Sequence, residues 1–278
     1  MNCVERIVHY ANEVPNEFNP SKPEVLSNDW PRGEIKFVDY SMRYRPDLPL
    51  VLKNINLTIS SGEKIGICGR TGSGKSSLLL SLYRMVEPAS GSIFIDDIDI
   101  QQLKTHQLRN NVSIIPQEPT LFSGTIRSNL DPFDSYSDVQ IWSALEKASM
   151  KDAIDKLEHG LEAPVVSGGS NFSVGQRQLL CLARAMIRKT RVIILDEATA
   201  SVDMESDSVI QRTIREHFQN CTVLTIAHRL NTIMDYDRIM VLQQGECVEF
   251  DSPKQLVNME NGLFKSMLVQ AGIIRNQK

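Results

Sequence analysis

The sequence contains few cysteines, and their arrangement argues against two kinds of protein. The five are odd in number and widely separated, and no two form a Cys-x-x-Cys pair: Cys3, Cys68, Cys181, Cys221 and Cys247. A disulfide-stapled domain needs paired cysteines, and a zinc site usually needs close pairs. We therefore expect buried or free thiols in a reducing compartment, with metal ligation a poor second interpretation.

Long apolar runs and an excess of basic residues are also absent. No run approaches the roughly 18 apolar residues that a membrane-spanning helix needs, and Met1–Asn12 is too polar for a signal peptide. The chain has 30 Lys and Arg residues against 34 Asp and Glu residues, so its formal net charge is −4. We expect a soluble, cytosolic chain with no uniformly basic surface for nucleic acid, although a local basic patch fits within this total.

What is present is an ordinary globular composition with an unusual start. The chain has 278 residues, of which 41% are hydrophobic and 23% charged, and this length predicts one or two domains. Apolar residues recur at helical spacing in Cys3–Asn12, which predicts a short amphipathic helix. Glu13–Arg32 holds several prolines and is typical of an extended linker. A helix followed by a linker at the N-terminus has two equally good interpretations: the chain is a fragment of a longer protein, or this terminus is simply frayed.

From Glu34 onward, strand-like and helix-like segments alternate. We expect strands at Ile35–Tyr44, Val51–Ile59, Lys64–Cys68, Ser92–Ile95, Val112–Ile115, Val192–Leu195, Thr222–Ile226 and Arg238–Leu242. We expect helices at Ser76–Val86, Val139–Ala148, about Gly175–Arg188 and Glu205–Phe218, and one that begins at Ser252-Pro253. Residues 118–188 are expected to be mostly helical. This alternation predicts an α/β fold with a mostly parallel sheet and helices on both faces.

One glycine-rich segment between a predicted strand and a predicted helix matches the phosphate-binding pattern GxxxxGK[ST]: Gly69, Arg70, Thr71, Gly72, Ser73, Gly74, Lys75 and Ser76. Glycines allow backbone N–H groups to curl around a phosphate, and the following helix adds the positive end of its dipole. Lys75 is then expected to reach the β- and γ-phosphates, and the Ser76 hydroxyl to ligate Mg²⁺.

Polar residues follow three other predicted strands. Asp196 and Glu197 come directly after Val192–Leu195, and strand alternation allows Asp196 to face Mg²⁺ while Glu197 faces the γ-phosphate. A helix cap is the alternative role for these acids. Gln117 and His228 follow two further strands and mean little alone. Because ligands of open α/β sheets lie at the carboxyl ends of the strands, the coincidence favours a functional site.

The order of these motifs resembles the nucleotide-binding domain of an ABC transporter over about Gly33 to Gly272. It is most similar to the second, C-terminal domain of the multidrug-resistance-associated-protein subfamily. The stretches that carry this resemblance are Ile115–Pro119, Leu121–Gly124, Asn129–Phe133, Phe172–Gln178, Ala198–Asp203 and Thr225–Asp235. Val4–Ile7 is similar to the segment that follows the last membrane helix of that family, so residues 1–31 resemble a fragment of that linker.

The resemblance implies a role for each matching position in ATP binding. Tyr44 corresponds to the aromatic residue that stacks on adenine, with Tyr40 as its rival. The phosphate loop extends to Ser77. Gln117 corresponds to the glutamine that touches Mg²⁺, senses the γ-phosphate and leads into a loop that contacts the membrane domains. Asp196 corresponds to the second metal-binding residue.

The resemblance also implies the hydrolytic and partner-facing residues. Glu197 corresponds to the general base and His228 to the residue that orients the attacking water, with Lys75 and Gln117 completing the catalytic set. Asp203 corresponds to a loop that crosses the dimer interface. The signature motif, which binds ATP on an opposite domain, corresponds to Ser173, Val174, Gly175 and Gln176.

This signature departs from the family pattern Leu-Ser-Gly-Gly-Gln. Val174 occupies a position at which the general family pattern has glycine. Its β-branched side chain restricts how closely the backbone can approach a phosphate. Phe172 replaces leucine. We therefore expect this chain to be a poor donor of a signature, while its own phosphate loop, acids and histidine are complete.

The expected fold is a RecA-like P-loop NTPase core, with an N-terminal antiparallel β subdomain and a helical subdomain inserted near 118–185. Residues 1–31 would be the linker and 32–278 the nucleotide-binding domain. The expected function is binding and hydrolysis of Mg·ATP to drive export through membrane segments outside this chain. The expected partners are the first nucleotide-binding domain, in an ATP-dependent head-to-tail dimer, and the transmembrane domains. The expected location is the cytoplasmic face of a membrane.

Other classes of function account for part of the pattern. A nucleotide-sensing domain that gates a channel or receptor of the same subfamily is the alternative. A DNA-repair or chromosome-organising ATPase would have long coiled coils between loop and signature, where this chain has only 77–171. A P-loop kinase or GTPase would lack the signature.

Overall fold

The computed structural model describes residues 3–13, 17, 20, 23–27, 29–196, 204–227 and 229–274. The central sheet has six strands in the order β12-β11-β3-β10-β9-β6. Their bounds are Glu246–Asp251, Arg238–Gln243, Lys64–Cys68, Thr222–Ile226, Val192–Asp196 and Val112–Ile115. The five strands from β11 to β6 are parallel, and β12 pairs antiparallel with β11. This confirms the expected mostly parallel sheet.

A second sheet is antiparallel and has the order β2-β1-β4-β5. Its strands are Leu52–Ile59, Ile35–Met42, Ser90–Ile95 and Ile98–Asp99. Apolar side chains alternate along β1 and β2, so one face of this sheet is buried. That face packs with Ile65 and Ile67 of β3 and with Leu78 of α2 (Lys75–Leu82) in one hydrophobic cluster. The helix that follows the glycine-rich loop is therefore held between the two sheets.

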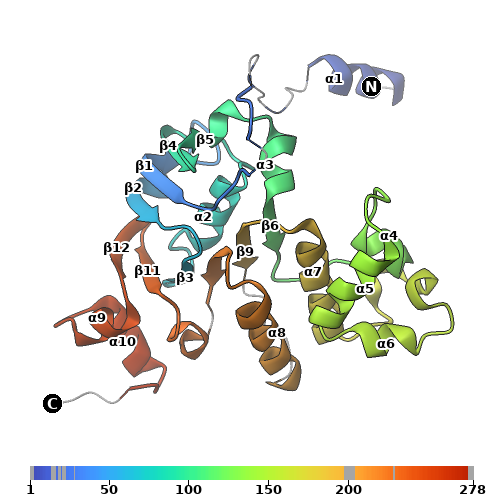
Figure 1. Ribbon diagram of the computed structural model, residues 1–278. Helices are drawn as coiled ribbons and strands as arrows, with labels where there is room; N and C mark the ends of the chain where they lie inside the picture. The colour runs from blue at the N-terminus through green and yellow to red at the C-terminus, as the bar shows by residue number, and fades with distance from the viewer. Residues whose placement is uncertain are drawn as a thin grey trace.

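The remaining helices flank the sheets or form a separate group (Figure 1). Their bounds are α1 Cys3–Asn12, α3 Thr105–Asn111, α4 Ile126–Leu130, α5 Asp138–Lys147, α6 Lys151–Asp155, α7 Val174–Arg188, α8 Met204–His217, α9 Pro253–Asn258 and α10 Leu263–Gln270. Short 3₁₀ turns occupy Ile100–Gln102, Gly160–Glu162, Ser167–Gly169 and Leu230–Ile233. Helices α4, α5 and α6 gather beyond α7, on the far side from the antiparallel sheet (Figure 1).

The helical group has a core of its own that continues into the central sheet. Buried side chains of α4, α5 and α7 cluster with Ile193 and Leu195 of β9. A two-stranded ribbon, β7 (Gly124–Thr125) with β8 (Pro164–Val165), lies within it. Ser173 caps α7, whose apolar side is buried between this group and β9.

Most element bounds agree with the sequence analysis to within a few residues, and β3, β6, β10 and α1 agree at both ends. The sequence analysis missed β12, β5, the ribbon inside the helical region, and the helices α3 and α10. No residue of α1 is buried. Within the described part of the chain, no helix combines the length and apolar character required to cross a membrane.

Candidate functional site

The glycine-rich loop joins the carboxyl end of β3 to the first turn of α2. Gly69, Gly72 and Gly74 all have positive φ values, of 150°, 79° and 105°. A Cβ atom at Gly69 would lie 2.3 Å from the carbonyl oxygen of Leu242, and one at Gly74 would lie 2.9 Å from Leu52 Cδ2. Close approach of neighbouring chain therefore requires glycine at these two positions.

Lys75 folds back over the loop that it follows. Its Nζ donates to the carbonyl oxygens of Gly69 at 2.9 Å and Arg70 at 3.2 Å. The ammonium group is thus held against the backbone of the loop, and Lys75 lines the same cleft as Gly69–Thr71, where it can pair with a phosphate.

The two serines after Lys75 have different surroundings. Ser76 is exposed in the first turn of α2, as a metal-ligating hydroxyl must be, whereas Ser77 is buried. The Ser77 Oγ lies 2.9 Å from the hydroxyl of Tyr44. Ser77 therefore supports the neighbouring aromatic residue in this structure.

The structure separates the two candidate adenine-stacking tyrosines. Tyr44 is 47% exposed, whereas Tyr40 is 2% exposed and its ring packs edge-on against Phe37 at a centroid distance of 5.8 Å. Burial raises the pKa of Tyr40 to about 12. The Tyr40 ring belongs to the core between the sheets, which leaves Tyr44 as the available aromatic surface.

Three strands beside β3 end at the same edge of the sheet as the loop. In the order β3-β10-β9-β6, they lead to Ala227, to Asp196 and, through Pro116, to Gln117. Asp196 is the last residue of β9 and pairs in register with Ile226 of β10. The expected meeting of Asp196 and Gln117 at one edge with the phosphate loop is therefore present. Glu197, Asp203 and His228 lie outside the described residues.

The donor set at this edge fits Mg²⁺ and a phosphate group. Ser76, Gln117 and Asp196 offer hydroxyl, amide and carboxylate oxygens, which are the ligands that Mg²⁺ prefers. The buried Oγ of Ser73 has no hydrogen-bond partner among the described residues. The described residues contain no cluster of three or more His, Cys, Asp or Glu side chains that could hold a different metal.

The predicted signature residues lie apart from this loop, at the start of α7. The Ser173 Oγ accepts from the Gln176 N–H at 3.1 Å, and the Gln176 Oε1 accepts from the Ser173 N–H at 3.0 Å. This reciprocal cap fixes the helix N-terminus. Val174 is half-buried and Gly175 is buried.

Phe172 corrects part of the sequence analysis. It is 8% exposed and packs in the hydrophobic core of the helical group. Its side chain faces the chain's own core and not a partner, so the expectation that Phe172 spoils the signature surface is wrong. The branched side chain of Val174 remains as the departure from the family pattern.

Two clefts border the phosphate loop. One of about 970 Å³ is lined by Gly69–Thr71, Lys75, Ala227, Arg229–Asn231 and the end of α10, and one of about 200 Å³ by Arg70–Ser73 with Leu242–Gln244. No signature residue lines either of these clefts. The described residues thus form one side of a phosphate site and leave the other side open.

Sequence reasoning missed two residues that hold the site in place. Gly245, in the β11–β12 turn, donates its N–H to the Ser73 carbonyl at 3.1 Å and accepts from the Lys53 N–H at 2.8 Å. Gln178 on α7 is fully buried and donates to the Pro116 carbonyl at 3.4 Å, beside Gln117. Gly245 could have been found from the glycine-containing turn in the sequence. The role of Gln178 depends on a contact with a residue 62 positions away in the sequence.

Comparison with known proteins places these features in a family. A family model described as "ABC transporter" matches residues 52–200. The chain is 54% identical over 272 residues to ATP-binding cassette sub-family C member 2 of Rattus norvegicus, covering 98% of this chain and 18% of that protein. It is also 54% identical over 272 residues to multidrug resistance protein mrp-7 of Caenorhabditis elegans, covering 96% of this chain and 18% of that protein. The chain therefore spans about a fifth of the length of these relatives.

A solved structure gives the same result for the fold. A bacterial Atm1-family ABC exporter with ATP bound superposes with a TM-score of 0.87 at 29% sequence identity, over 99% of this chain and 47% of the exporter chain. The expected ABC ATPase fold is thereby confirmed, including its antiparallel β subdomain.

Proposed function

The chain belongs to the ABC transporter family, and from this membership we propose that it is the second, C-terminal nucleotide-binding domain of an exporter, where it binds and hydrolyses Mg·ATP. The observation that carries the proposal is the position of Lys75. Its ammonium group rests on the Gly69 and Arg70 carbonyls within a loop whose backbone is open to an anion. The similarity to an exporter with ATP bound supports ATP as that anion.

The chain's own residues divide the work of binding. Tyr44 stacks on the adenine, the N–H groups of Gly69–Ser77 surround the phosphates, and Lys75 pairs with the β- and γ-phosphates. Ser76, Gln117 and Asp196 hold Mg²⁺ by their oxygens. When bound, this ion neutralises charge on the phosphate oxygens.

Hydrolysis is attack by water on the γ-phosphorus, with release of ADP and inorganic phosphate. We assign Glu197 to accept a proton from the attacking water and His228 to orient that water. Lys75 and Gln117 stabilise charge at the γ-phosphate and sense its presence. These assignments rest on the position of each residue in the family motifs.

The open side of the phosphate site supports a head-to-tail dimer with the first nucleotide-binding domain of the same transporter. Ser173–Gln176 would cap the γ-phosphate of that domain, and the partner's signature would cap this chain's γ-phosphate. The loop after Gln117 would contact the transmembrane domains, and residues 1–31 would continue from the last membrane helix. In this proposal the domain, 32–278 with its helical subdomain near 118–185, would lie at the cytoplasmic face of a membrane.

Calorimetry with Mg·ATP, combined with phosphate-release assays, tests the proposal. We expect ATP to bind the chain and hydrolysis to rise on addition of the first nucleotide-binding domain of the same protein. In that mixture, Glu197→Gln should retain ATP and trap a heterodimer that elutes early in size-exclusion chromatography. ATP binding without any hydrolysis in the heterodimer would contradict the enzymatic role and favour a nucleotide sensor.

A further inference from the structure

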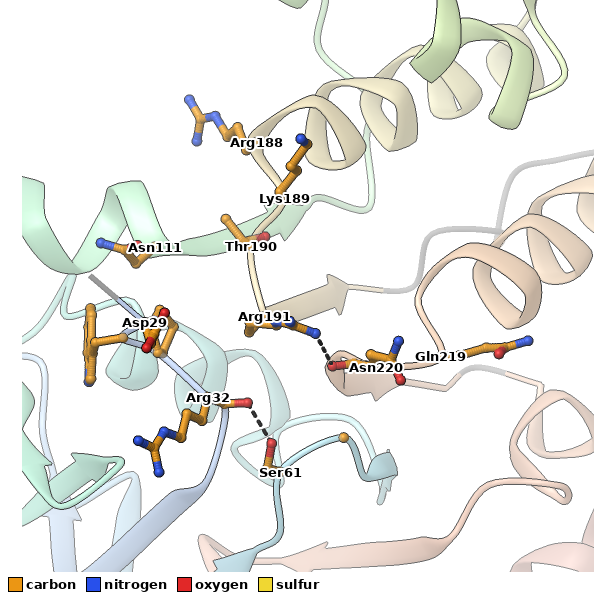
Figure 2. Close-up of a pocket in the computed structure, with 13 residues that line it drawn as sticks. Asp29, Arg32, Ser61, Asn111, Arg188, Lys189, Thr190, Arg191, Gln219 and Asn220 are labelled. Atoms are coloured by element: carbon orange, nitrogen blue, oxygen red, sulfur yellow. Dashed lines mark hydrogen bonds between the residues drawn. The ribbon is translucent and has the colours of Figure 1, made fainter. Parts of the chain in front are cut away.

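A separate cleft lies at the edge of the central sheet opposite to the phosphate loop (Figure 2). It encloses about 850 Å³. Its walls are the segments that lead into β3, β6, β9 and β10, together with Asp29–Arg32 of the N-terminal linker. The linker and the sheet edge thus form the cleft jointly, on the side of the sheet that the nucleotide does not use.

The lining of this cleft is strongly basic in a chain whose net charge is negative. It contains four cationic side chains against one carboxylate, that of Asp29: Arg32, Arg188, Lys189 and Arg191. All four are exposed, and none forms an ion pair with a described residue. Arg191 makes a hydrogen bond to the carbonyl oxygen of Asn220 at 3.3 Å, which leaves its charge uncompensated.

Stabilisation of a helix end explains only two of these four cations. Arg188 and Lys189 end α7, where cations interact favourably with the helix dipole. Arg32 lies in the linker and Arg191 in the bend before β9, so neither belongs to the last turn of α7. Four exposed cations along one cleft repel each other, and an anionic occupant would relieve that repulsion.

The backbone that presents these cations is held in place. Arg32 donates its N–H to Asp96, and its carbonyl accepts from Ser61 Oγ at 2.5 Å. The Arg191 carbonyl accepts from the Thr222 N–H at 2.8 Å, and the buried Thr190 hydroxyl donates to Ser113 Oγ at 2.8 Å. The two arginines therefore start from fixed points of the backbone, and in Figure 2 the Arg191 side chain points toward Asn220 while that of Arg32 points the other way.

The cleft continues past the end of α7. A neighbouring hollow of about 380 Å³ shares Lys189–Arg191, Gln219 and Asn220 with it and adds the cation of Lys147, the carboxylate of Glu216 and the imidazole of His217. The cations thus extend along a groove and do not surround one point. An extended occupant with several negative charges matches this shape better than one small anion does.

We propose that this groove binds an extended acidic peptide, supplied by a part of the same protein that lies outside this chain. Charge complementarity sets the chemistry of the occupant. We assign the peptide to the same protein for two reasons. The chain corresponds to about 18% of the length of its relatives, and Asp29–Arg32 of the N-terminal linker form one wall of the groove. Occupancy would hold the linker against the domain. This proposal is independent of ATP binding, since the phosphate loop lies at the other edge of the sheet.

Fluorescence anisotropy with fluorescein-labelled octaglutamate tests the groove on the whole 278-residue chain. We expect saturable binding that weakens as salt rises from about 0.05 M to about 0.5 M. The triple variant Arg188→Ala/Lys189→Ala/Arg191→Ala should bind at least about tenfold more weakly. The control Lys36→Ala/Arg212→Ala/Lys254→Ala removes the same charge from exposed positions outside the groove and should bind like the parent.

Further arms separate the groove from general electrostatics. An equal loss of octaglutamate affinity in both triple variants would overturn the proposal. So would displacement of the labelled peptide by tripolyphosphate at the same concentration as by unlabelled octaglutamate, because this result would indicate a site for a small anion. Octaglutamine should not bind. The single variant Arg191→Glu keeps the test valid if the triple variant misfolds. Its melting temperature and its Mg·ATP affinity should equal those of the parent, and it should bind octaglutamate at least about tenfold more weakly. Retained peptide binding by Arg191→Glu would overturn the proposal.

Discussion

The hydroxyl of Tyr44 lies 2.9 Å from the Oγ of Ser77, so the exposed ring at the edge of the antiparallel sheet is tied to the helix that carries the phosphate loop. Ser77 is buried at its side of the contact, and Tyr44 is 47% exposed. The proposed base-stacking surface and the phosphate-binding backbone are thus linked through one hydrogen bond.

The ring and the hydroxyl of Tyr44 can be tested separately. Tyr44→Ala should weaken Mg·ATP binding by about 1–3 kcal/mol, because one base–aromatic stack is lost, whereas Tyr44→Trp should be tolerated. Tyr44→Phe keeps the ring but loses the hydrogen bond to Ser77. We expect this variant to weaken Mg·ATP binding by about 0.5–1.5 kcal/mol. Calorimetry measures all three. A larger loss of affinity in a folded Tyr40→Ala variant would contradict the choice of Tyr44.

Lys75→Ala should abolish Mg·ATP binding or greatly weaken it. The variant loses the ammonium group that the Gly69 and Arg70 carbonyls hold inside the loop. Calorimetry in the presence of Mg²⁺ measures the affinity, with Lys36→Ala, on the exposed face of β1, as a matched loss of charge. Equal affinity in the parent and Lys75→Ala would show that the loop does not bind the phosphates as assigned.

Gly245→Ala should disturb the phosphate loop from a distance. A Cβ at Gly245 would lie 2.2 Å from the Val51 carbonyl oxygen, and the residue's φ is 88°. The turn must shift, which pulls on the hydrogen bond to Ser73. We expect lower thermal stability together with weaker Mg·ATP binding. Gly62→Ala is the control, because its φ is 80° but no atom lies within 4 Å of the added Cβ; it should lose some stability and keep its nucleotide affinity.

Gln178→Met should separate binding from turnover. The variant loses the bond to Pro116 that connects α7 to the segment before Gln117, while its volume is nearly unchanged. The Gln178 Oε1 is buried without a partner among the described residues, so the fold should tolerate the change. We expect Mg·ATP affinity within about twofold of the parent and a lower kcat for partner-stimulated phosphate release. A change in KM alone would argue against a link between α7 and Gln117.

The sequence predicts this fold well where local patterns and packing agree. Apolar strands such as Thr222–Ile226 and a glycine-rich loop before a helix are readable without tertiary information. β12 was missed because its burial alternates weakly on an edge strand. The choice between Tyr40 and Tyr44 depended on burial between two sheets, which spacing along one strand does not reveal.

Long-range contacts explain the remaining differences. Phe172 was expected to weaken the signature, but it packs in a helical core that is assembled from α4, α5 and α7, which are separated along the chain. The basic groove is formed by residues of the linker, of the end of α7 and of the segments that lead into β3, β6, β9 and β10. Three of its cations fall in the short basic run Arg188-Lys189-Thr190-Arg191, but the fourth, Arg32, is distant in sequence, so the sequence alone does not bring the two segments together.

The isolated chain should bind Mg·ATP and hydrolyse it slowly, because the signature residues line neither cleft beside its own phosphate loop. In a homodimer the missing side would come from Ser173–Gln176 of a second copy, where Val174 restricts the approach of backbone to a phosphate. Phosphate release should therefore rise when a partner domain with an unaltered Leu-Ser-Gly-Gly-Gln is added. Val174→Gly should leave ATP bound to this chain's own site in the heterodimer largely unaffected, because this signature serves the other site. Size-exclusion chromatography with and without ATP, alongside phosphate-release assays, measures both effects. Fast turnover by the monomer alone, linear in protein concentration, would mean that one chain completes its own active site.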